Sequence, residues 1–213
     1  MTRASLRAAA LALSVVAGAV AAGAHGTAES NPPAAEADPL AGRFGGPFTL
    51  TDHTGRRVSD SDFRGKYLLV YFGFTHCVDA CPIDLAIQHL ALDAIGPAAD
   101  LVQPLFITVD PARDTPDVLA AYLEGFHPST IGLTGSESEI AGAAKAYRVH
   151  RRKVALDGPE AEHLRDTAGV YIVDHGTLTF LMGPDGQFLT LAPHTTTAER
   201  LAELLLSYLP HAH

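Results

Sequence analysis

An unbroken apolar run constrains the fold of this chain more than any other part of its sequence. The run reads Tyr67-Leu-Leu-Val-Tyr-Phe-Gly-Phe74. Apolar residues without an alternating polar face are typical of a strand that is buried on both sides in a parallel sheet. A second run of this kind spans residues 101–109. We therefore expect two buried strands in the central sheet.

Helical patterns alternate with these strands. Apolar residues recur at helical spacing within residues 82–95, at positions 83, 86, 87, 90, 91, 94 and 95. Thr115-Pro116-Asp117 has the pattern of a helix start, with an N-cap residue followed by proline. Further helices are predicted over 137–147 and 197–209, a hairpin over 48–58, and short strands over 170–173, 178–182 and 187–191. This order predicts an α/β fold with an N-terminal hairpin and a mixed central sheet flanked by helices.

The charge balance excludes one broad class of partner. The formal net charge is −9, with 15 basic and 24 acidic residues. Such a chain lacks the excess of positive charge with which proteins hold a phosphate backbone. We therefore expect no nucleic-acid binding. The densest basic run, Arg151-Arg152-Lys153, is predicted to be a solvated turn.

The N-terminus has the pattern of an export signal. Arg3 and Arg7 precede 17 uncharged residues, 8–24, which end in a small-x-small cleavage pattern. Residues 1–24 are therefore predicted to be a signal peptide or a retained N-terminal membrane anchor. Residues 25–43, rich in Ala, Pro and small polar residues, are predicted to be a flexible linker. Residues 44–213 are predicted to form one domain outside the cytosol, where disulfides persist.

The chain has two cysteines, Cys77 and Cys81, between the first buried strand and the helix that follows it. A helix N-terminus favours the thiolate form, and a spacing of four places both sulfurs on one face. Such a pair forms a structural disulfide, acts as a reversible redox pair, or holds a soft ion such as Cu(I) or, with nitrogen ligands, zinc. A disulfide over so short a loop restricts the unfolded chain little, so the other two uses are favoured.

A metal site needs a further ligand, and the chain has 11 histidines. His76 adjoins Cys77, but neighbouring residues at a strand end point to opposite sides. His175 follows a predicted strand on a short loop, a place where rigid strands present functional residues. Asp174 beside it is either a partner that orients the imidazole or a turn residue. Spacing alone leaves open whether this loop faces the cysteines.

The segment Tyr71-Phe-Gly-Phe-Thr-His-Cys-Val-Asp-Ala-Cys-Pro82 closely resembles the SCO/SenC family of copper chaperones for cytochrome c oxidase assembly. Three further segments resemble that family in the same order: Val109-Asp-Pro-Ala-Arg-Asp-Thr-Pro116, Ile131-Gly-Leu-Thr-Gly135 and Tyr171-Ile-Val-Asp-His175. The resemblance implies a thioredoxin-like fold. It also implies a location in the periplasm or on the outer face of the cytoplasmic membrane, with the N-terminal segment as a signal or an anchor.

The resemblance implies a copper site made of Cys77, Cys81 and His175, which binds both Cu(I) and Cu(II). The implied function is delivery of copper to the dinuclear copper site of cytochrome c oxidase subunit II, reduction of that subunit's cysteines, or both. Subunit II or a similar client, and an upstream copper chaperone, are the implied partners. The chain departs from the family pattern at Val78, Ala80 and Gly176, and none of these departures removes a ligand.

Two other functions fit the same fold. One is an extracytoplasmic thiol-disulfide oxidoreductase or a peroxidase, in which Cys77 and Cys81 would be the redox pair and His175 would not be needed. Three residues separate these cysteines, however, whereas thioredoxin-type enzymes have two. The other is a copper or redox sensor, which binds metal without delivering it.

Overall fold

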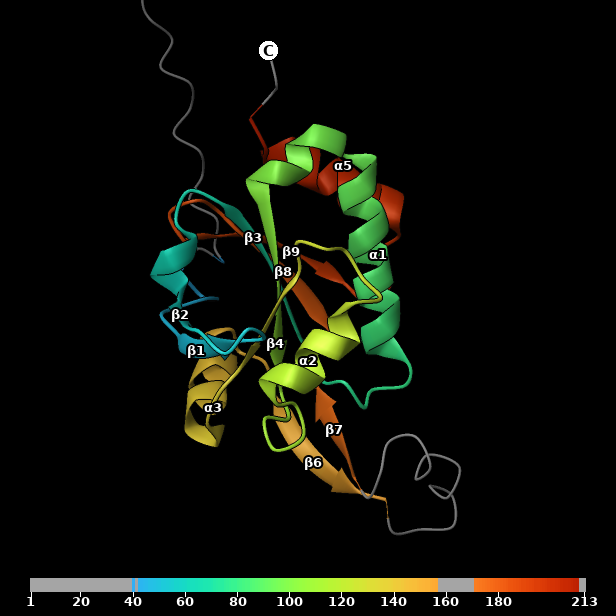
Figure 1. The fold of residues 1–213 in the computed structure, drawn as a ribbon. Coiled ribbons are helices and arrows are strands. Elements are labelled where there is room, and N and C mark those ends of the chain that lie inside the picture. The colour runs from blue at the N-terminus through green and yellow to red at the C-terminus, as the bar shows by residue number, and fades with distance from the viewer. Residues whose placement is uncertain (1–39, 41, 157–170, 211–213) are drawn as a thin grey trace, which may run out of the picture. The chain divides into compact units, whose positions relative to one another are not determined.

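Two parallel strands lie in the middle of the sheet in the computed structural model of the protein (Figure 1). They are β3 (Tyr67–Gly73) and β4 (Val102–Thr108), paired from Tyr67 opposite Val102 to Gly73 opposite Thr108. The six residues that follow Tyr67 in β3 are all buried. The prediction of two buried strands is therefore confirmed.

The structure describes residues 40, 42–156 and 171–210. The predicted signal or anchor, 1–24, lies outside the described residues, as does most of the predicted linker, so these boundaries stay predictions. Among the helices of the described residues, none is long and apolar enough to cross a membrane.

The central sheet has seven strands in the order β2-β1-β5-β4-β3-β8-β9. The strands that flank β3 and β4 are β1 (Thr49–Asp52), β2 (Arg57–Ser59), β5 (Ile131–Thr134), β8 (Leu178–Met182) and β9 (Phe188–Pro193). The β3–β4 and β4–β5 pairs are parallel, and the other pairs are antiparallel. The sheet is thus mixed, and the predicted α/β class and N-terminal hairpin are confirmed.

Helices cover both faces of this sheet (Figure 1). Helices α1 (Ala80–Ala94) and α5 (Ala198–Tyr208) pack together on one face, around a core that includes Leu69, Leu92 and Leu205. Helix α3 (Glu137–Ala146) belongs to the other core, with Phe72 and Ile140. A fourth α-helix of the described residues, α2 (Pro116–Leu123), begins at the predicted N-cap, where the Thr115 side chain accepts a hydrogen bond from the Val118 amide.

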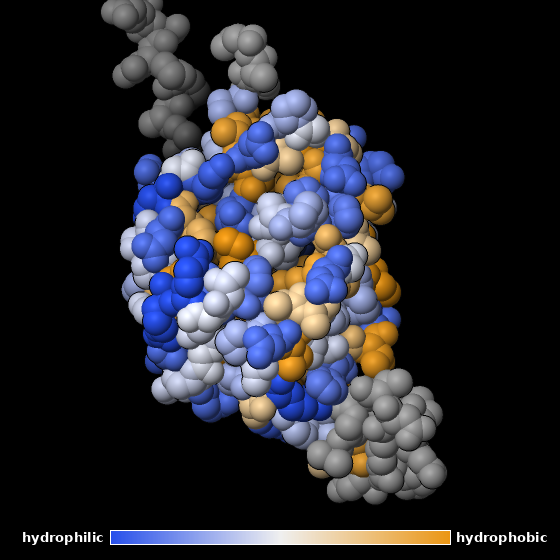
Figure 2. All heavy atoms as spheres, viewed as in Figure 1, coloured by the Kyte–Doolittle hydropathy of each residue, from blue (hydrophilic) through white to orange (hydrophobic). Residues whose placement is uncertain are grey.

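The buried face of α1 differs from the one that its apolar spacing predicts. Ile83 and Leu90 are 46% and 59% exposed. The buried residues of the helix are Cys81, Asp84, Leu85, Gln88, Ala91 and Leu92, of which only Ala91 belongs to the apolar pattern. Two of these are polar and have partners, because Asp84 bonds His194 and Gln88 bonds Thr179. Apolar side chains are consequently exposed along the edge of the molecule where α1 lies (Figure 2).

A separate two-stranded sheet carries the third predicted ligand. It pairs β6 (Arg151–Ala155) with β7 (Tyr171–His175), and Arg151 lies opposite His175. The prediction of a solvated turn at residues 151–153 is therefore wrong. The basic side chains are accommodated in a strand because each has an acidic partner: Arg151 with Glu137, Arg152 with Asp174 and Lys153 with Asp110.

Candidate metal centre

The structure brings Cys77, Cys81 and His175 together. One ligand atom from each, two Sγ atoms and an imidazole nitrogen, lies within 4.8 Å of the others. No second group of three or more such His, Cys, Asp or Glu residues is found in the described part of the chain. Both cysteines are free thiols. Residues 94 positions apart in the chain thus converge at one end of β3 and α1.

The cysteines occupy the connection between β3 and α1. The Cys77 amide donates to the Phe74 carbonyl at 3.1 Å, which closes a turn just beyond the strand. Cys81 lies in the first turn of α1, and its amide donates to Cys77 Sγ at 3.4 Å. A helix N-terminus thus presents a free N–H group to one sulfur, as expected for an anion in that position. Cys77 is half-buried, whereas Cys81 is completely buried.

These surroundings separate the acidities of the two thiols. A hydrogen bond from the Cys81 thiol, together with His175 and two backbone N–H groups, lowers the pKa of Cys77 to about 4 against the opposing effect of burial. The same hydrogen bond raises the pKa of Cys81, and burial raises it further. The pair therefore consists of an accessible thiolate and a buried thiol that donates to it.

This difference predicts selective alkylation of the metal-free, reduced protein. At pH 5 iodoacetamide should modify Cys77 and leave Cys81 unmodified, because only Cys77 is both accessible and ionised. Since lower basicity also lowers nucleophilicity, we expect a rate on the order of tenfold above that of an unperturbed thiol. Peptide mass spectrometry after brief labelling measures the extent of modification at each cysteine, with Cys77→Ala as the control. Equal modification of both residues would contradict the asymmetry.

His175 ends β7 and reaches the sulfurs with one defined nitrogen. Its Nδ1 lies 2.9 Å from the Gly176 carbonyl oxygen, and its Nε2 lies 3.6 Å from Cys81 Sγ. Because a carbonyl only accepts, Nδ1 carries a proton, and Nε2 is the nitrogen that faces the sulfurs. The Phe74 ring meets the imidazole edge-to-face, with centroids 5.7 Å apart. This is the orientation that a metal-binding histidine needs.

His76 and Asp174 line the same hollow as Cys77 and His175, but neither belongs to the three residues whose ligand atoms converge. The Asp174 carboxylate pairs with Arg152 at 3.2 Å and with His150 at 3.5 Å. The carbonyl of Gly176, not Asp174, orients His175. His76 Nδ1 lies 3.1 Å from Thr75 Oγ1.

Gly73 is a residue of the site that sequence reasoning missed, although it lies within the quoted segment. A Cβ at this position would lie 2.6 Å from the Phe106 ring and 3.0 Å from Cys81 Sγ. The last residue of β3 must therefore lack a side chain for the Cys81 thiol to sit against the strand.

We expect Gly73→Ala to disturb the site and the core together. The added methyl group must displace Phe106 or Cys81, which should lower the free energy of unfolding by about 1–3 kcal/mol. Urea unfolding measures that loss, and titration of the two thiols reports whether Cys81 has moved. Gly142→Ala is the matched control, since a Cβ there meets no atom within 4 Å. Wild-type stability for Gly73→Ala would show that the strand yields without cost.

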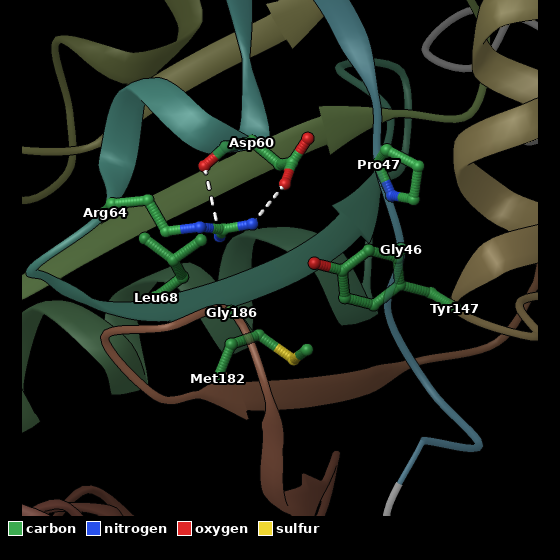
Figure 3. Close-up of a pocket in the computed structure, with 8 residues that line it drawn as sticks. All are labelled: Gly46, Pro47, Asp60, Arg64, Leu68, Tyr147, Met182 and Gly186. Atoms are coloured by element: carbon green, nitrogen blue, oxygen red, sulfur yellow. Dashed lines mark hydrogen bonds and ion pairs between the residues drawn. The ribbon is translucent and has the colours of Figure 1, made fainter.

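Two of the three residues lie at an open hollow of about 480 Å³, and Cys81 is buried behind them. Cys77 and His175 line it, with Val78 and Ile172 among the apolar residues at its wall. A different cavity of about 190 Å³, shown in Figure 3, contains none of the three. Its charged groups already satisfy each other, because Arg64 donates to the Asp60 carboxylate at 2.7 Å. Of these two cavities, the hollow beside Cys77 and His175 is therefore the one suited to chemistry with a metal or a partner.

Comparison with known proteins now decides the family. The family model described as SCO1/SenC matches residues 36–210, which is most of the chain. The chain belongs to the SCO1/SenC family. It is 42% identical over 167 residues to the protein sco1 of Schizosaccharomyces pombe, an alignment that covers 78% of this chain and 61% of that protein. The chain spans between 46% and 61% of the length of the first curated SCO1 relatives that it matches.

Solved SCO structures share the fold. Bradyrhizobium japonicum ScoI, solved with copper bound, is 41% identical with a TM-score of 0.69, covering 78% of this chain and 99% of that one. BsSco, described as a member of the Sco family of cytochrome c oxidase assembly proteins with a disulfide switch, is 26% identical with a TM-score of 0.55; the match covers 76% of this chain and 91% of that one. The predicted thioredoxin-like fold is therefore confirmed.

Proposed function

We propose that this SCO1/SenC protein binds copper through Cys77 Sγ, Cys81 Sγ and His175 Nε2 and delivers it to a client protein. The observation that carries the proposal is the convergence of these three atoms within 4.8 Å of one another. Copper is the cargo in this function. Its presence in the related B. japonicum ScoI supports the choice of metal.

The donor set suits both oxidation states of copper. Two thiolates are soft ligands that favour Cu(I), and a neutral imidazole is a ligand that Cu(II) also accepts. The ordered Nδ1–H bond to Gly176 leaves Nε2 ready to bind without a change of tautomer. Copper binding also requires Cys81 to lose its proton, so binding should release protons to the solvent.

The same geometry supports transfer to a client. Three protein ligands leave one side of the ion open, and Cys77 and His175 face the hollow at the surface. An incoming cysteine or histidine of a partner can therefore approach from the hollow while Cys81 still holds the ion from the buried side. Transfer then proceeds as an exchange of ligands, one protein donor at a time.

We further propose that the client is cytochrome c oxidase subunit II or a protein with a similar copper site. The description of BsSco as an oxidase assembly protein supports this client. An upstream copper chaperone would load the domain. The export pattern of residues 1–24 supports a location in the periplasm or on the outer face of the cytoplasmic membrane, anchored there if the segment is retained.

Copper transfer tests this function directly. The copper-loaded protein is mixed with the copper-free soluble domain of subunit II, and the absorption spectrum of its dinuclear centre is followed. We expect the spectrum to appear with the loaded protein and not with a Cys77→Ala variant taken through the same loading step, because that variant should not hold copper tightly. Reduction of a subunit II disulfide without copper transfer would overturn the delivery function.

That last outcome would favour the second candidate, a thiol-disulfide reductase. One observation supports it: an accessible low-pKa thiol next to a buried thiol is the arrangement of an attacking and a resolving cysteine. Such an enzyme would not need His175. Turnover on a disulfide substrate that survives His175→Ala would support this activity, and turnover lost with it would exclude it.

A further inference from the structure

The loop between β4 and α2 holds two carboxylates that the proposed function does not use. Asp110 and Asp114 are both 0% exposed. Buried carboxylates are rare unless hydrogen-bonded or paired, because removing the charge from water is costly. Both carboxylates have hydrogen-bond partners. Asp114 contacts the segment that carries the cysteines (the cysteine arm), and Asp110 contacts the strand that carries His175 (the histidine arm). We propose that the two aspartates are positioning residues that set the distance between the cysteine pair and His175.

Asp114 holds the arm that carries the cysteines. Its Oδ1 accepts from the Thr75 hydroxyl at 2.7 Å, and its Oδ2 accepts from the Thr75 amide at 3.2 Å. Thr75 lies two residues before Cys77, in the turn that follows β3. The carboxylate therefore fixes the backbone at the point where the chain leaves the sheet toward the sulfurs.

Asp110 holds the arm that carries His175. Its Oδ1 accepts from the Tyr171 hydroxyl at 2.9 Å and lies 3.6 Å from Lys153 Nζ. Tyr171 begins β7, the strand that ends at His175, and Lys153 belongs to β6. One buried carboxylate thus binds both strands of the β6–β7 pair, which is the hairpin that carries His175.

Arg113 joins this contact to the site itself. It pairs with Asp110 Oδ2 and donates to the Tyr171 carbonyl at 3.2 Å. Its guanidinium lies 3.8 Å from the centre of the Tyr171 ring and 5.7 Å from that of Phe74, the residue whose ring meets His175. The loop therefore reaches the imidazole through the cation–π contact of Arg113 with the Phe74 ring, which itself meets His175.

The two carboxylates are also connected to each other. Thr108 Oγ1 accepts from the Asp110 amide at 2.9 Å and donates to Asp114 Oδ2 at 2.6 Å. The Asp114 amide donates to the Asp110 carbonyl at 3.0 Å. Movement of one carboxylate is therefore resisted by the other. Both arms are thus attached to the same hydrogen-bonded turn.

This loop matters because it is one of the attachments that hold β6 and β7 to the rest of the domain. Among the described strands, neither β6 nor β7 pairs with the seven-stranded sheet, so no ladder of backbone hydrogen bonds fixes His175 relative to the cysteines. Side chains make the connection instead. They are those of the loop, of Arg151, which donates to the Val109 carbonyl at 2.9 Å, and of Val173 in β7, which is buried in the core with Phe72. A small rotation of the hairpin would carry Nε2 out of reach of the sulfurs.

Asp110→Asn tests the histidine arm. The amide is isosteric but cannot pair with Arg113 and Lys153 as an anion. In the metal-free protein we expect loss of the NMR contact between the Phe74 and His175 rings. In the copper protein, affinity for Cu(II) should fall by about 10- to 100-fold, the range for residues that orient a ligand. The nitrogen hyperfine pattern in the EPR spectrum of the bound Cu(II) should weaken as well. Tyr171→Phe, which removes a single hydroxyl, should show the same changes more weakly.

Asp114→Asn tests the cysteine arm. In this variant the NMR contact between the Phe74 and His175 rings should remain. The equilibrium constant for disulfide formation between Cys77 and Cys81 with glutathione should shift severalfold, because the Asp114 carboxylate no longer fixes Thr75 in the turn before Cys77. Asp117→Asn, an exposed aspartate in the first turn of α2, is the matched control and should change neither readout.

The proposal rests on the proposed function only for the identity of the metal. The ring contact and the glutathione equilibrium are measured without copper, so they test the positioning even if the protein proves not to deliver copper. Wild-type values for both readouts in both variants would overturn it. So would equal changes of both readouts in both variants, because that pattern indicates general destabilisation of the fold.

Discussion

The Cys77→Ala protein is expected to lose tight copper binding. Removal of this sulfur leaves one buried thiol and one imidazole, and it takes away the ligand that is already ionised near neutral pH. A change of a residue that merely orients a ligand costs about 10- to 100-fold in affinity, so we expect the loss here to exceed 100-fold. Competition with a chromogenic Cu(I) chelator measures the affinity.

His175→Ala is expected to have a different signature from Cys77→Ala. Both thiolates remain, so Cu(I) should bind with a smaller loss of affinity, whereas Cu(II) should lose its nitrogen ligand and its EPR hyperfine pattern. His150→Ala is the matched control, because His150 lies near the same hairpin but its Nε2 faces Asp174. Wild-type affinity in both Cys77→Ala and His175→Ala would place the copper site elsewhere in the chain.

The elements that sequence patterns predicted share one property. The runs around β3 and β4 are predominantly apolar without an alternating polar face, and the start of α2 has a cap with a local hydrogen bond at Thr115. Signals of this kind depend on neighbours within a few residues. For that reason the fold class and most elements could be predicted before any tertiary contact was known.

The failures depend on contacts between distant residues. Apolar spacing does not give the buried face of α1, because Asp84 and Gln88 are buried against partners distant in the sequence, His194 and Thr179. Three successive basic residues look like a turn unless their acidic partners are known, and those partners come from three different elements. Periodicity cannot detect either situation.

The metal centre likewise depends partly on local sequence and partly on contacts between distant residues. The placement of Cys77 and Cys81 between a strand and a helix could be predicted from local sequence. Their meeting with His175 could be inferred only from resemblance to a family, because β7 is not paired to the central sheet. Asp110 and Asp114 gave no signal of burial at all, since an aspartate beside a proline or threonine is an ordinary turn residue.

Oxidation of the cysteine pair is expected to abolish copper binding completely. Formation of the Cys77–Cys81 disulfide joins the two sulfurs, removes two electrons and releases the proton that Cys81 holds. Neither sulfur then remains a thiolate, and His175 alone cannot hold the ion. The required movement is small, because both Sγ atoms already lie within 4.8 Å of each other and of His175 Nε2.

The measurement is bound copper after equilibration with mixtures of reduced and oxidised glutathione. Bound copper should fall with the fraction of disulfide, and dithiothreitol should restore it. Cys81→Ala is the control, since any copper that it retains should be insensitive to this treatment once mixed disulfides are excluded by mass. Copper retained by the fully oxidised protein would show that the thiolates are not its ligands.

The disulfide itself should stabilise the fold only modestly. It closes a loop of five residues, 77–81, for which the entropy model gives at most about 2 kcal/mol. Copper bound at 1,000 times its Kd would contribute about 4 kcal/mol. Thermal unfolding should therefore rank the copper-loaded protein above the oxidised one. A pair selected for structural stabilisation would give the opposite order, so this ranking separates a copper site with a redox switch from a structural disulfide.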